Sequence, residues 1–199
     1  MTSQLHKKSY WDSFYERDLK IMTETGDIGE KWFGETVEER VIEKIEDYFP
    51  KNSSITCLDI GCGNGNVTNI LSDIGYDCLG IDFSENSIKL CTAAFPNQSF
   101  LCDNILETSL TTTFDFLFDK GTFDAIWLRE TPRDCQLYVE NTQKLLKDRG
   151  LLFITSCNLT RDELIDQFKC FKVIDEVEYP KFQFGGQQGQ CVTTLIFEK

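Results

Sequence analysis

The fold of this chain is decided by the stretch Cys57-Leu58-Asp59-Ile60-Gly61-Cys62-Gly63-Asn64-Gly65. Its first four residues are typical of a buried strand, and glycines then recur at alternate positions. Glycine has no Cβ atom, so such a turn can adopt positive φ angles and let a ligand approach the backbone closely. In an open parallel sheet, ligands bind beyond the carboxyl ends of the strands, where this turn would lie. The stretch therefore predicts a ligand-binding turn between a strand and a helix.

The spacing of these glycines argues against a nicotinamide dinucleotide. The dinucleotide fingerprint G-x-G-x-x-G places its third glycine at position 66, which is Asn66 here. Two later acids point to a nucleoside instead: Asp82 ends the next predicted strand, at a spacing suited to ribose hydroxyls, and Asp103 ends the strand after it. Each acid alone could equally be a helix cap or a turn residue. Together with Asp59, they favour a nucleoside-binding site over a simple tight turn.

Short apolar runs alternate with helical patterns from residue 55 onward, which is the signature of crossover units on a parallel sheet. We predict strands at 55–60, 78–82, 99–102, 114–119, 151–156, 171–178 and 191–198. Helices fit between them at about 65–74, 84–94, 133–147 and 161–169. No helical pattern separates the last two strands, so they should pair as an antiparallel hairpin at one edge. The expected fold is α/β and Rossmann-like, with a seven-stranded, mostly parallel sheet and helices on both faces.

Two helices should precede the first strand. Residues 10–22 carry one helical stripe of large apolar side chains, Trp11, Phe14, Tyr15, Leu19 and Met22. Thr36 and Glu39 have the spacing of a capping box, which predicts that a second helix begins at about residue 37. We interpret residues 1–199 as a single domain, in which residues 1–52 form an N-terminal helical lid or substrate-binding segment and residues 53–199 form the Rossmann-like core.

Composition narrows the class of protein further. The 199 residues carry a net charge of −13, which disfavours attraction to a nucleic acid or to an anionic membrane surface. No run approaches the roughly 18 apolar residues that span a bilayer, and the polar N-terminus lacks the apolar core of a signal peptide. We therefore expect a cytoplasmic protein, with the nucleus as the alternative, that binds neither nucleic acid nor membrane directly and is a monomer.

The spacing of the cysteines and the single histidine disfavour a metal site and histidine-based catalysis. The nine cysteines form no C-x-x-C pair, so neither a zinc site nor a disulfide framework has its usual spacing. We expect reduced, mostly buried thiols and no metal. The single histidine, His6, lies close to the N-terminus, which makes a catalytic triad improbable.

A family resemblance rests on the segment that ends the fourth predicted strand. The glycine stretch with Asp59 has the form D-x-G-x-G-x-G, which resembles the S-adenosylmethionine loop of class I methyltransferases. The run Asp119-Lys120-Gly121-Thr122-Phe123-Asp124 is similar to a signature of protein-lysine methyltransferases, including several that act on translation elongation factor 1-alpha. Residues 10–12, 26–35, 155–160 and 180–186 resemble one branch of these enzymes, the methyltransferase-like protein 10 proteins. The resemblance extends from about residue 10 to the end, whereas residues 127–136 match nothing in that pattern.

The resemblance implies an S-adenosylmethionine-dependent protein-lysine N-methyltransferase with elongation factor 1-alpha as its substrate. The cofactor would be held by Trp32, Asp59, Gly61, Cys62, Gly63, Asn64, Gly65, Asp82, Phe83, Asp103, Asn104, Ile105 and Asp119. In methyltransferases of this type the acid at Asp103 hydrogen-bonds the adenine amino group. Alternatives are methylation of another protein or a small amine, or a non-catalytic binding partner with the same fold. No N-P-P-Y-like string follows the fourth strand, which argues against adenine or glutamine N-methylation.

Methyl transfer to lysine needs a neutral amine, and the sequence offers candidate residues for lowering the lysine pKa and for orienting the amine. Lysine has a pKa of about 10.4, so deprotonation near neutral pH costs roughly 4 kcal/mol unless burial lowers that pKa. Aromatic candidates for a desolvated, cation-binding channel are Trp32, Phe33, Phe123, Phe182 and Phe184. We expect Asp119 to face the transfer point as the catalytic residue, with a turn-stabilising role as the alternative. Asp124 is expected to be structural.

Overall fold

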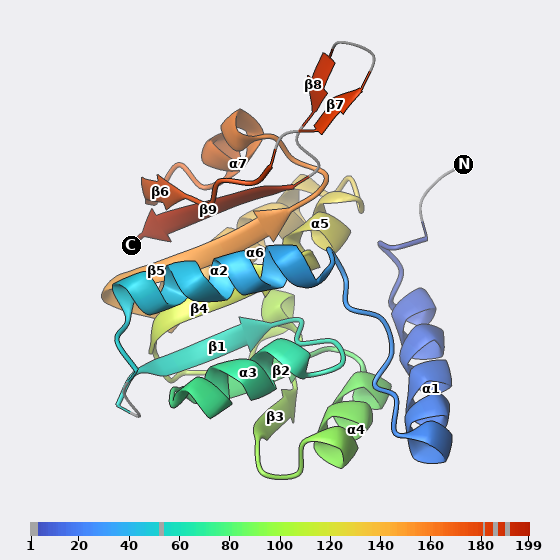
Figure 1. The fold of residues 1–199 in the computed structure, drawn as a ribbon. Helices are drawn as coiled ribbons and strands as arrows, with labels where there is room; N and C mark the ends of the chain where they lie inside the picture. The colour runs from blue at the N-terminus through green and yellow to red at the C-terminus, as the bar shows by residue number, and fades with distance from the viewer. Residues whose placement is uncertain (1–3, 52–53, 181, 185–186, 190–191) are drawn as a thin grey trace.

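The structure is a computed structural model that describes residues 4–51, 54–180, 182–184, 187–189 and 192–199. Its centre is a seven-stranded sheet in the order β3-β2-β1-β4-β5-β9-β6 (Figure 1). The strands are β1 (Thr56–Ile60), β2 (Asp77–Asp82), β3 (Ser99–Cys102), β4 (Phe114–Lys120), β5 (Leu146–Ser156), β6 (Lys172–Glu176) and β9 (Thr193–Glu198). Strands β1 to β5 pair in parallel, and β9 runs antiparallel to both β5 and β6. The predicted Rossmann-like fold is confirmed.

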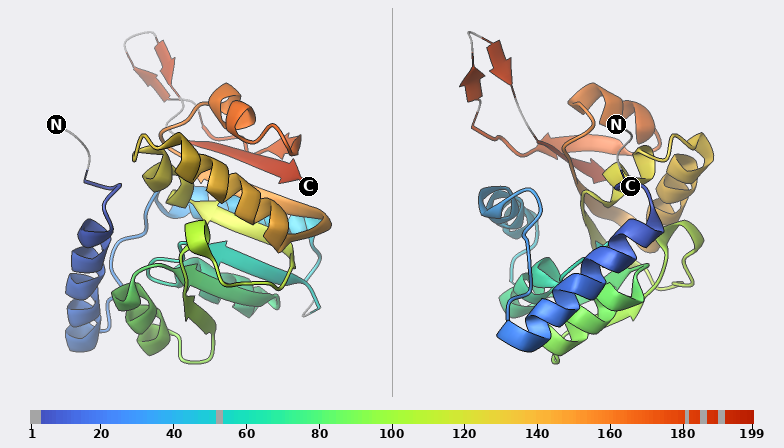
Figure 2. Two further views of the ribbon diagram at one scale, coloured as in Figure 1. Left: turned by 180° about the vertical axis from the view of Figure 1, so that it is seen from behind. Right: turned by 90° about the vertical axis from the view of Figure 1, so that its right-hand side faces the viewer.

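Helices cover both faces of the sheet (Figures 1 and 2). They are α1 (Lys8–Thr25), α2 (Glu35–Tyr48), α3 (Asn66–Ile74), α4 (Glu85–Ala94), α5 (Thr122–Trp127), α6 (Pro132–Leu145) and α7 (Arg161–Gln167), with a 3-10 turn, η1 (Ile105–Glu107). Successive side chains of a strand point to opposite faces. Phe116 of β4 therefore packs with Val41 of α2 on one face, while Leu117 packs with Tyr138 of α6 on the other. The two apolar layers hold the carboxyl edge of the sheet rigidly in place.

The C-terminal strands pair as an antiparallel hairpin at one edge of the sheet, as predicted. Strand β9 inserts between β5 and β6, so that β6 alone lies at the edge. The segment between them, expected as a plain Gly-rich connection, carries a separate two-stranded ribbon of β7 (Phe182–Phe184) and β8 (Gln187–Gly189). Phe182 and Phe184 were candidates for the rim of the site, but their side chains lie outside the described part of the chain.

Several element boundaries differ from the sequence prediction, and those of α2 and β5 have a clear structural reason. Helix α2 begins at Glu35, with Gly34 at its N-cap, so the predicted capping box at Thr36 is wrong. Gly34 has a φ of 79°, a conformation that lets the chain enter the helix before Thr36 is reached. Strand β5 begins at Leu146 rather than at residue 151, because Leu146 pairs with Phe114 across an irregularity in the β4–β5 register. Neither difference moves the strand ends that face the site.

Helix α1 lies across the end of the sheet, against α4 (Figures 1 and 2). The Asn86 side chain of α4 donates a hydrogen bond to the carbonyl of Asp12 at 3.1 Å, and the Lys8 ammonium lies 5.2 Å from the centre of the Phe83 ring. These contacts hold the N-terminal helix over the carboxyl ends of the strands. In the described part of the chain, every helix is too short or too polar to cross a membrane.

Candidate active site

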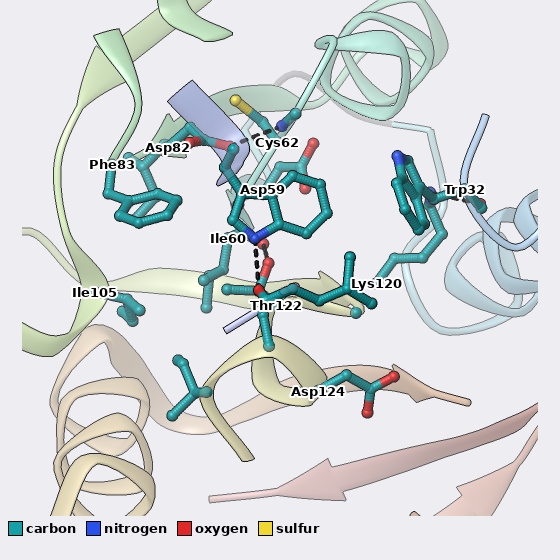
Figure 3. A pocket seen from close by; sticks show the side chains of 18 of the residues that line it. Trp32, Asp59, Ile60, Cys62, Asp82, Phe83, Ile105, Lys120, Thr122 and Asp124 are labelled. Carbon is teal, nitrogen blue, oxygen red and sulfur yellow. Dashed lines mark hydrogen bonds between the residues drawn. The ribbon is translucent and has the colours of Figure 1, made fainter. Parts of the chain in front are cut away.

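A cavity opens at the carboxyl ends of β1, β2 and β4, under α1 and the segment that joins α1 to α2 (Figure 3). Its floor is formed by the glycine loop and the strand ends, and its far wall by α5 and the residues after β5. Large apolar rings from the N-terminal segment form the roof, namely Trp11, Phe14, Tyr15, Trp32 and Phe33. The cavity is thus partly apolar, with polar groups supplied mainly by the ends of the strands.

The glycine loop has the geometry that the sequence predicted. Gly61 and Cys62 donate their backbone N–H groups to the carbonyl of Ile81 at 2.8 and 2.9 Å, which fixes the loop to β2. Gly61 has a φ of 69°, and a Cβ atom there would lie 1.9 Å from the Thr122 hydroxyl oxygen. The Asn64 amide donates to the carbonyl of Glu30 at 3.3 Å and so ties the loop to the roof. Only a side chain without Cβ fits at Gly61.

Four of the five predicted loop residues, Gly61, Cys62, Gly63 and Asn64, line the cavity. Gly65 does not: it forms the N-cap of α3 in a left-handed conformation, where a Cβ atom would meet the Cys91 sulfur at 2.9 Å. Gly65 is therefore needed for the turn into the helix, and the expectation that it contacts the cofactor is not supported.

Asp82 ends β2 at the cavity, as expected. Its carboxylate accepts hydrogen bonds from the backbone N–H groups of Ser84 at 2.9 Å and Gly63 at 3.2 Å. Burial raises the pKa of Asp82 to about 6, and those hydrogen bonds oppose the rise. Phe83 follows it in the cavity wall. A carboxylate held by two N–H groups keeps lone pairs free for a ligand's hydroxyl groups.

Asp103, Asn104 and Ile105 line the cavity beyond β3. One Asp103 oxygen accepts hydrogen bonds from the Ser109 N–H at 3.0 Å and from its hydroxyl at 2.8 Å. The other oxygen, Oδ1, is buried without a hydrogen-bond partner among the described residues. Asn104 accepts from the Leu106 N–H at 3.1 Å and so begins the η1 turn. The unpaired Asp103 oxygen is an acceptor available to a ligand.

Trp32 supplies a matching unpaired donor. Its indole Nε1 is buried without a partner in the described part of the chain, and its ring packs edge-on against Trp11 at 5.3 Å. Buried polar groups are normally hydrogen-bonded, so two such atoms in one cavity point to a ligand. S-adenosylmethionine fits these two unpaired atoms, because its adenine amino group can donate a hydrogen bond to Asp103 and its carboxylate can accept one from Trp32.

Asp59 lies at the base of the cavity and forms part of a buried charged cluster. It accepts a hydrogen bond from the Thr68 hydroxyl at 2.7 Å, and burial raises its pKa to about 6. The Lys120 ammonium lies 3.7 Å from a Glu38 carboxylate oxygen and donates to the carbonyl of Trp32 at 3.0 Å. Burial lowers the pKa of Lys120, while Glu38 and Asp59 raise it. Lys120 thereby connects β4 to the segment that carries Trp32, a role that sequence analysis missed although the residue lies in its signature.

The side chain of Asp119, the expected catalytic residue, makes its hydrogen bonds within the turn after β4 and with α6. Its buried carboxylate accepts from the N–H groups of Thr122 at 2.9 Å and Phe123 at 3.0 Å, and from the Tyr138 hydroxyl at 2.5 Å. Asp119 is not among the residues that line the cavity. Burial raises its pKa to about 7. Asp119 therefore stabilises the turn into α5, and its catalytic and cofactor-binding role stays a prediction that the cavity lining does not support.

Phe123 is also absent from the cavity wall. It is buried between Tyr138, at a ring separation of 4.9 Å, and Phe168, at 5.0 Å. Asp124, expected to be structural, lines the cavity and also accepts hydrogen bonds from Ser156 and Cys157. Which side chain of the signature faces the cavity depends on the path of α5, a six-residue helix that the sequence pattern did not reveal.

Comparison with known proteins identifies the family. The family described as "Methyltransferase domain" matches residues 51–193. EEF1A lysine methyltransferase 2 from Danio rerio is 38% identical over 99% of this chain and 88% of its own length. The human protein of that name is 36% identical, covering 99% and 87%. Protein-lysine N-methyltransferase EFM4 from Saccharomyces cerevisiae is 33% identical, covering 100% and 96%.

Solved structures share the fold at low sequence identity. A TehB-like SAM-dependent methyltransferase from Corynebacterium glutamicum superposes with a TM-score of 0.68 at 19% identity, covering 97% of this chain and all of that one. N-methyltransferase NodS from Bradyrhizobium japonicum, in complex with S-adenosyl-L-homocysteine, has a TM-score of 0.69 at 16% identity, covering 94% and 97%. The glycine loop, the strand-end acids and the relatives agree: this chain belongs to the methyltransferase domain family, in the group of protein-lysine methyltransferases that includes EEF1A lysine methyltransferase 2.

Proposed function

We propose that this chain transfers a methyl group from S-adenosylmethionine to a lysine of translation elongation factor 1-alpha. The observation that carries the substrate is the identity of 32% to 38%, over 98% to 100% of the chain, with relatives named as EEF1A lysine methyltransferase 2 or protein-lysine N-methyltransferase EFM4. The cavity with its two unpaired polar atoms supports the donor.

The positions of the polar groups indicate how the donor would be held. The glycine loop and Trp32 would bind its amino-acid end, Asp82 its ribose hydroxyls, and Asp103 its adenine amino group, with Phe83 and Ile105 against the base. A carboxylate can accept hydrogen bonds from two hydroxyls at once, and such charge-assisted bonds are the stronger ones. When bound, the donor would supply a methyl group carried on a sulfonium. The bond between the methyl carbon and the lysine nitrogen would form as the bond between that carbon and the sulfur breaks.

The roof of the cavity would lower the cost of deprotonating the lysine. Trp11, Phe14, Trp32 and Phe33 line it from the N-terminal segment. Desolvation by such rings disfavours the charged ammonium and lowers the pKa of the lysine. A larger fraction of the lysine side chains has then lost a proton to solvent and is neutral before transfer. We therefore propose that residues 1–52 act as a lid and substrate-binding segment on the core formed by residues 53–199.

The cysteines and the net charge bear on where the protein acts and on its partner. We propose that the protein acts as a monomer in the cytoplasm, without direct contact to nucleic acid or membrane. The eight cysteines whose state the structure describes are all free thiols, which supports a reducing compartment. The net charge of −13 favours a basic protein as the partner.

Two measurements test the proposal. S-adenosylmethionine at 100 times its dissociation constant should stabilise the protein by about 2.7 kcal/mol in a thermal-shift titration. Incubation with labelled donor and recombinant elongation factor 1-alpha should label one lysine, located by mass spectrometry, and its Lys-to-Arg variant should stay unlabelled. Absence of a thermal shift overturns the donor. Label only on another protein or a small amine overturns the substrate, and binding of the factor without transfer shows a non-catalytic partner.

A further inference from the structure

We propose that Asp124 binds the ε-ammonium group of the substrate lysine as the substrate docks. Once that group has lost a proton to solvent, Asp124 accepts a hydrogen bond from the neutral amine and directs its nitrogen lone pair toward the donor. The inference rests on the proposed function and deepens it by assigning the acceptor subsite. Asp124 belongs to α5, and its side chain lies in the wall of the cavity (Figure 3). The sequence pattern alone had suggested a purely structural acid at this position.

The donor, bound as proposed, would leave this end of the cavity free. Its three parts would be held by the loop after β1, by Asp82 at the end of β2, and by Asp103 beyond β3. In the sheet order, β4 and β5 lie on the other side of β1. The wall there comes from α5 and from the residues after β5, Cys157 and Asn158. A second substrate can therefore approach from the β4–β5 side, where Asp124 is the acid in the wall.

The Asp124 carboxylate is held in place and retains capacity for one more hydrogen bond. Its Oδ1 accepts from the Ser156 hydroxyl, and its Oδ2 accepts from the Cys157 N–H at 2.8 Å and the Cys157 thiol at 3.3 Å. An ionised carboxyl group has about four lone-pair sites. These three donors come from the last residue of β5 and the residue that follows it, so they fix the orientation of the carboxylate and leave one lone-pair site free.

No cation neutralises Asp124 within the part of the chain that the structure describes. Lys120 and Arg129, the cationic side chains on this side of the cavity, are paired with other acids: Lys120 with Glu38 at 3.7 Å, and Arg129 with Asp134 at 2.8 Å. Asp124 is nevertheless only 4% exposed. A buried carboxylate without a counter-ion is costly even when it accepts hydrogen bonds, so a cationic ligand would offset part of that cost.

The other acids of the cavity are less suited to the lysine. Asp18 is paired with Arg17 at 2.8 Å, and Glu38 is paired with Lys120. Glu30 lies in the segment that joins α1 to α2, and it is exposed to solvent. Asp59 receives the Thr68 hydroxyl at the base of the glycine loop. Asp82 and Asp103 would bind the nucleoside part of the donor. Asp124 thus combines a cavity position, a fixed orientation and the absence of a cationic partner among the described residues.

The central experiment compares Asp124→Asn with Ser156→Ala. Asn keeps the size of the side chain and one acceptor oxygen but removes the charge, whereas Ser156→Ala removes a hydrogen bond to the same carboxylate and leaves the charge. For Asp124→Asn, we expect KM for elongation factor 1-alpha to rise about 10- to 100-fold, the range for a hydrogen bond to a charged group. The dissociation constant of S-adenosylhomocysteine should stay unchanged. For Ser156→Ala, KM should rise far less.

An equal rise in KM for both variants would overturn the proposal, because Asp124 would then act only by holding the segment after β5. A wild-type KM in Asp124→Asn would overturn it as well. If the wild-type protein does not modify the elongation factor at all, the proposed function fails instead. The two failures are therefore distinguishable.

A second measurement needs only the wild-type protein with S-adenosylhomocysteine bound. Calorimetry compares its affinity for the elongation factor with its affinity for a variant in which the methylated lysine is replaced by methionine, which has similar length and no charge. The lysine form should bind about 10-fold or more tightly, as expected for a charge-assisted hydrogen bond. Equal affinities would overturn the proposal even if Asp124→Asn does not fold.

Discussion

Lys120 links the sheet to the roof of the cavity, and removing its charge should weaken both. The side chain is 12% exposed and its partner Glu38 is 4% exposed. In Lys120→Met, the apolar stem stays, but Glu38 is left buried without its cation and the Trp32 carbonyl loses its 3.0 Å donor. Removing one partner of a buried ion pair typically costs about 3 to 5 kcal/mol. For a chain of this size, the melting temperature should fall by about 6 to 20 °C.

Urea denaturation of four variants measures this cost. Lys120→Met is compared with Glu38→Gln, with the double variant, and with Lys169→Met, which removes an exposed ion pair at 2.6 Å. The exposed pair should contribute at most about 1 kcal/mol. The double variant should lose less than the sum of the single losses, by about 0.5 to 3 kcal/mol. Donor affinity should also fall in Lys120→Met, because Trp32 is no longer tied to β4.

Two results would refute this reasoning. If the losses of Lys120→Met and Glu38→Gln are additive, the two charges do not stabilise one another. If Lys120→Met costs no more than the exposed control, the buried pair is not important for stability.

Three further predictions follow from the strand-end acids. Asp82→Ala should raise the dissociation constant of S-adenosylhomocysteine about 10- to 100-fold by calorimetry, and an unchanged value would contradict its ribose-binding role. Asp119→Ala should lower the free energy of unfolding by about 2 to 4 kcal/mol, because buried donors including the Tyr138 hydroxyl lose their acceptor. Lower turnover at unchanged stability would instead support Asp119 as a catalytic residue. Burial raises the pKa of Asp59 from an ordinary 3.8 to about 6, so folding favours its protonated form. The contribution of Asp59 to stability is therefore fully present below pH 4 and is lost as the pH rises through 6. Asp59→Asn should therefore gain about 3 kcal/mol relative to the wild-type protein between pH 4 and pH 8 in urea titrations, and a difference independent of pH would show that burial does not perturb Asp59.

The donor side of the site could be predicted from the sequence because its signals are local. Asp59, Asp82 and Asp103 each stand at or just beyond the end of a strand that is recognisable by its apolar run. The carboxyl ends of parallel strands meet at one edge of the sheet, so position along the chain is enough to place these side chains together. The glycine loop is equally local, since its positive φ angles follow from the residue type.

The acceptor side could not be predicted in this way. Asp119 at the end of β4 and Asp124 in α5 lie five residues apart, and both are acids of the same signature. Asp119 is turned inward by Tyr138 of α6 and by the first N–H groups of α5. Asp124 is held at the cavity wall by Ser156 and Cys157, more than 30 residues further along the chain. The side that each carboxylate faces is therefore decided by partners that are distant in sequence.

The sequence by itself determined the class of fold, the ligand-binding turn and the acids along three strand ends, because apolar periodicity and glycine conformation act over a few residues. Only the tertiary structure decided that Lys120 is paired with Glu38 under Trp32, that Gly65 belongs to the helix turn, and that Asp124 rather than Asp119 lines the cavity. Those outcomes depend on burial and on hydrogen-bond partners brought together from α2, α6 and β5. Such contacts form only when the two faces of the sheet are packed.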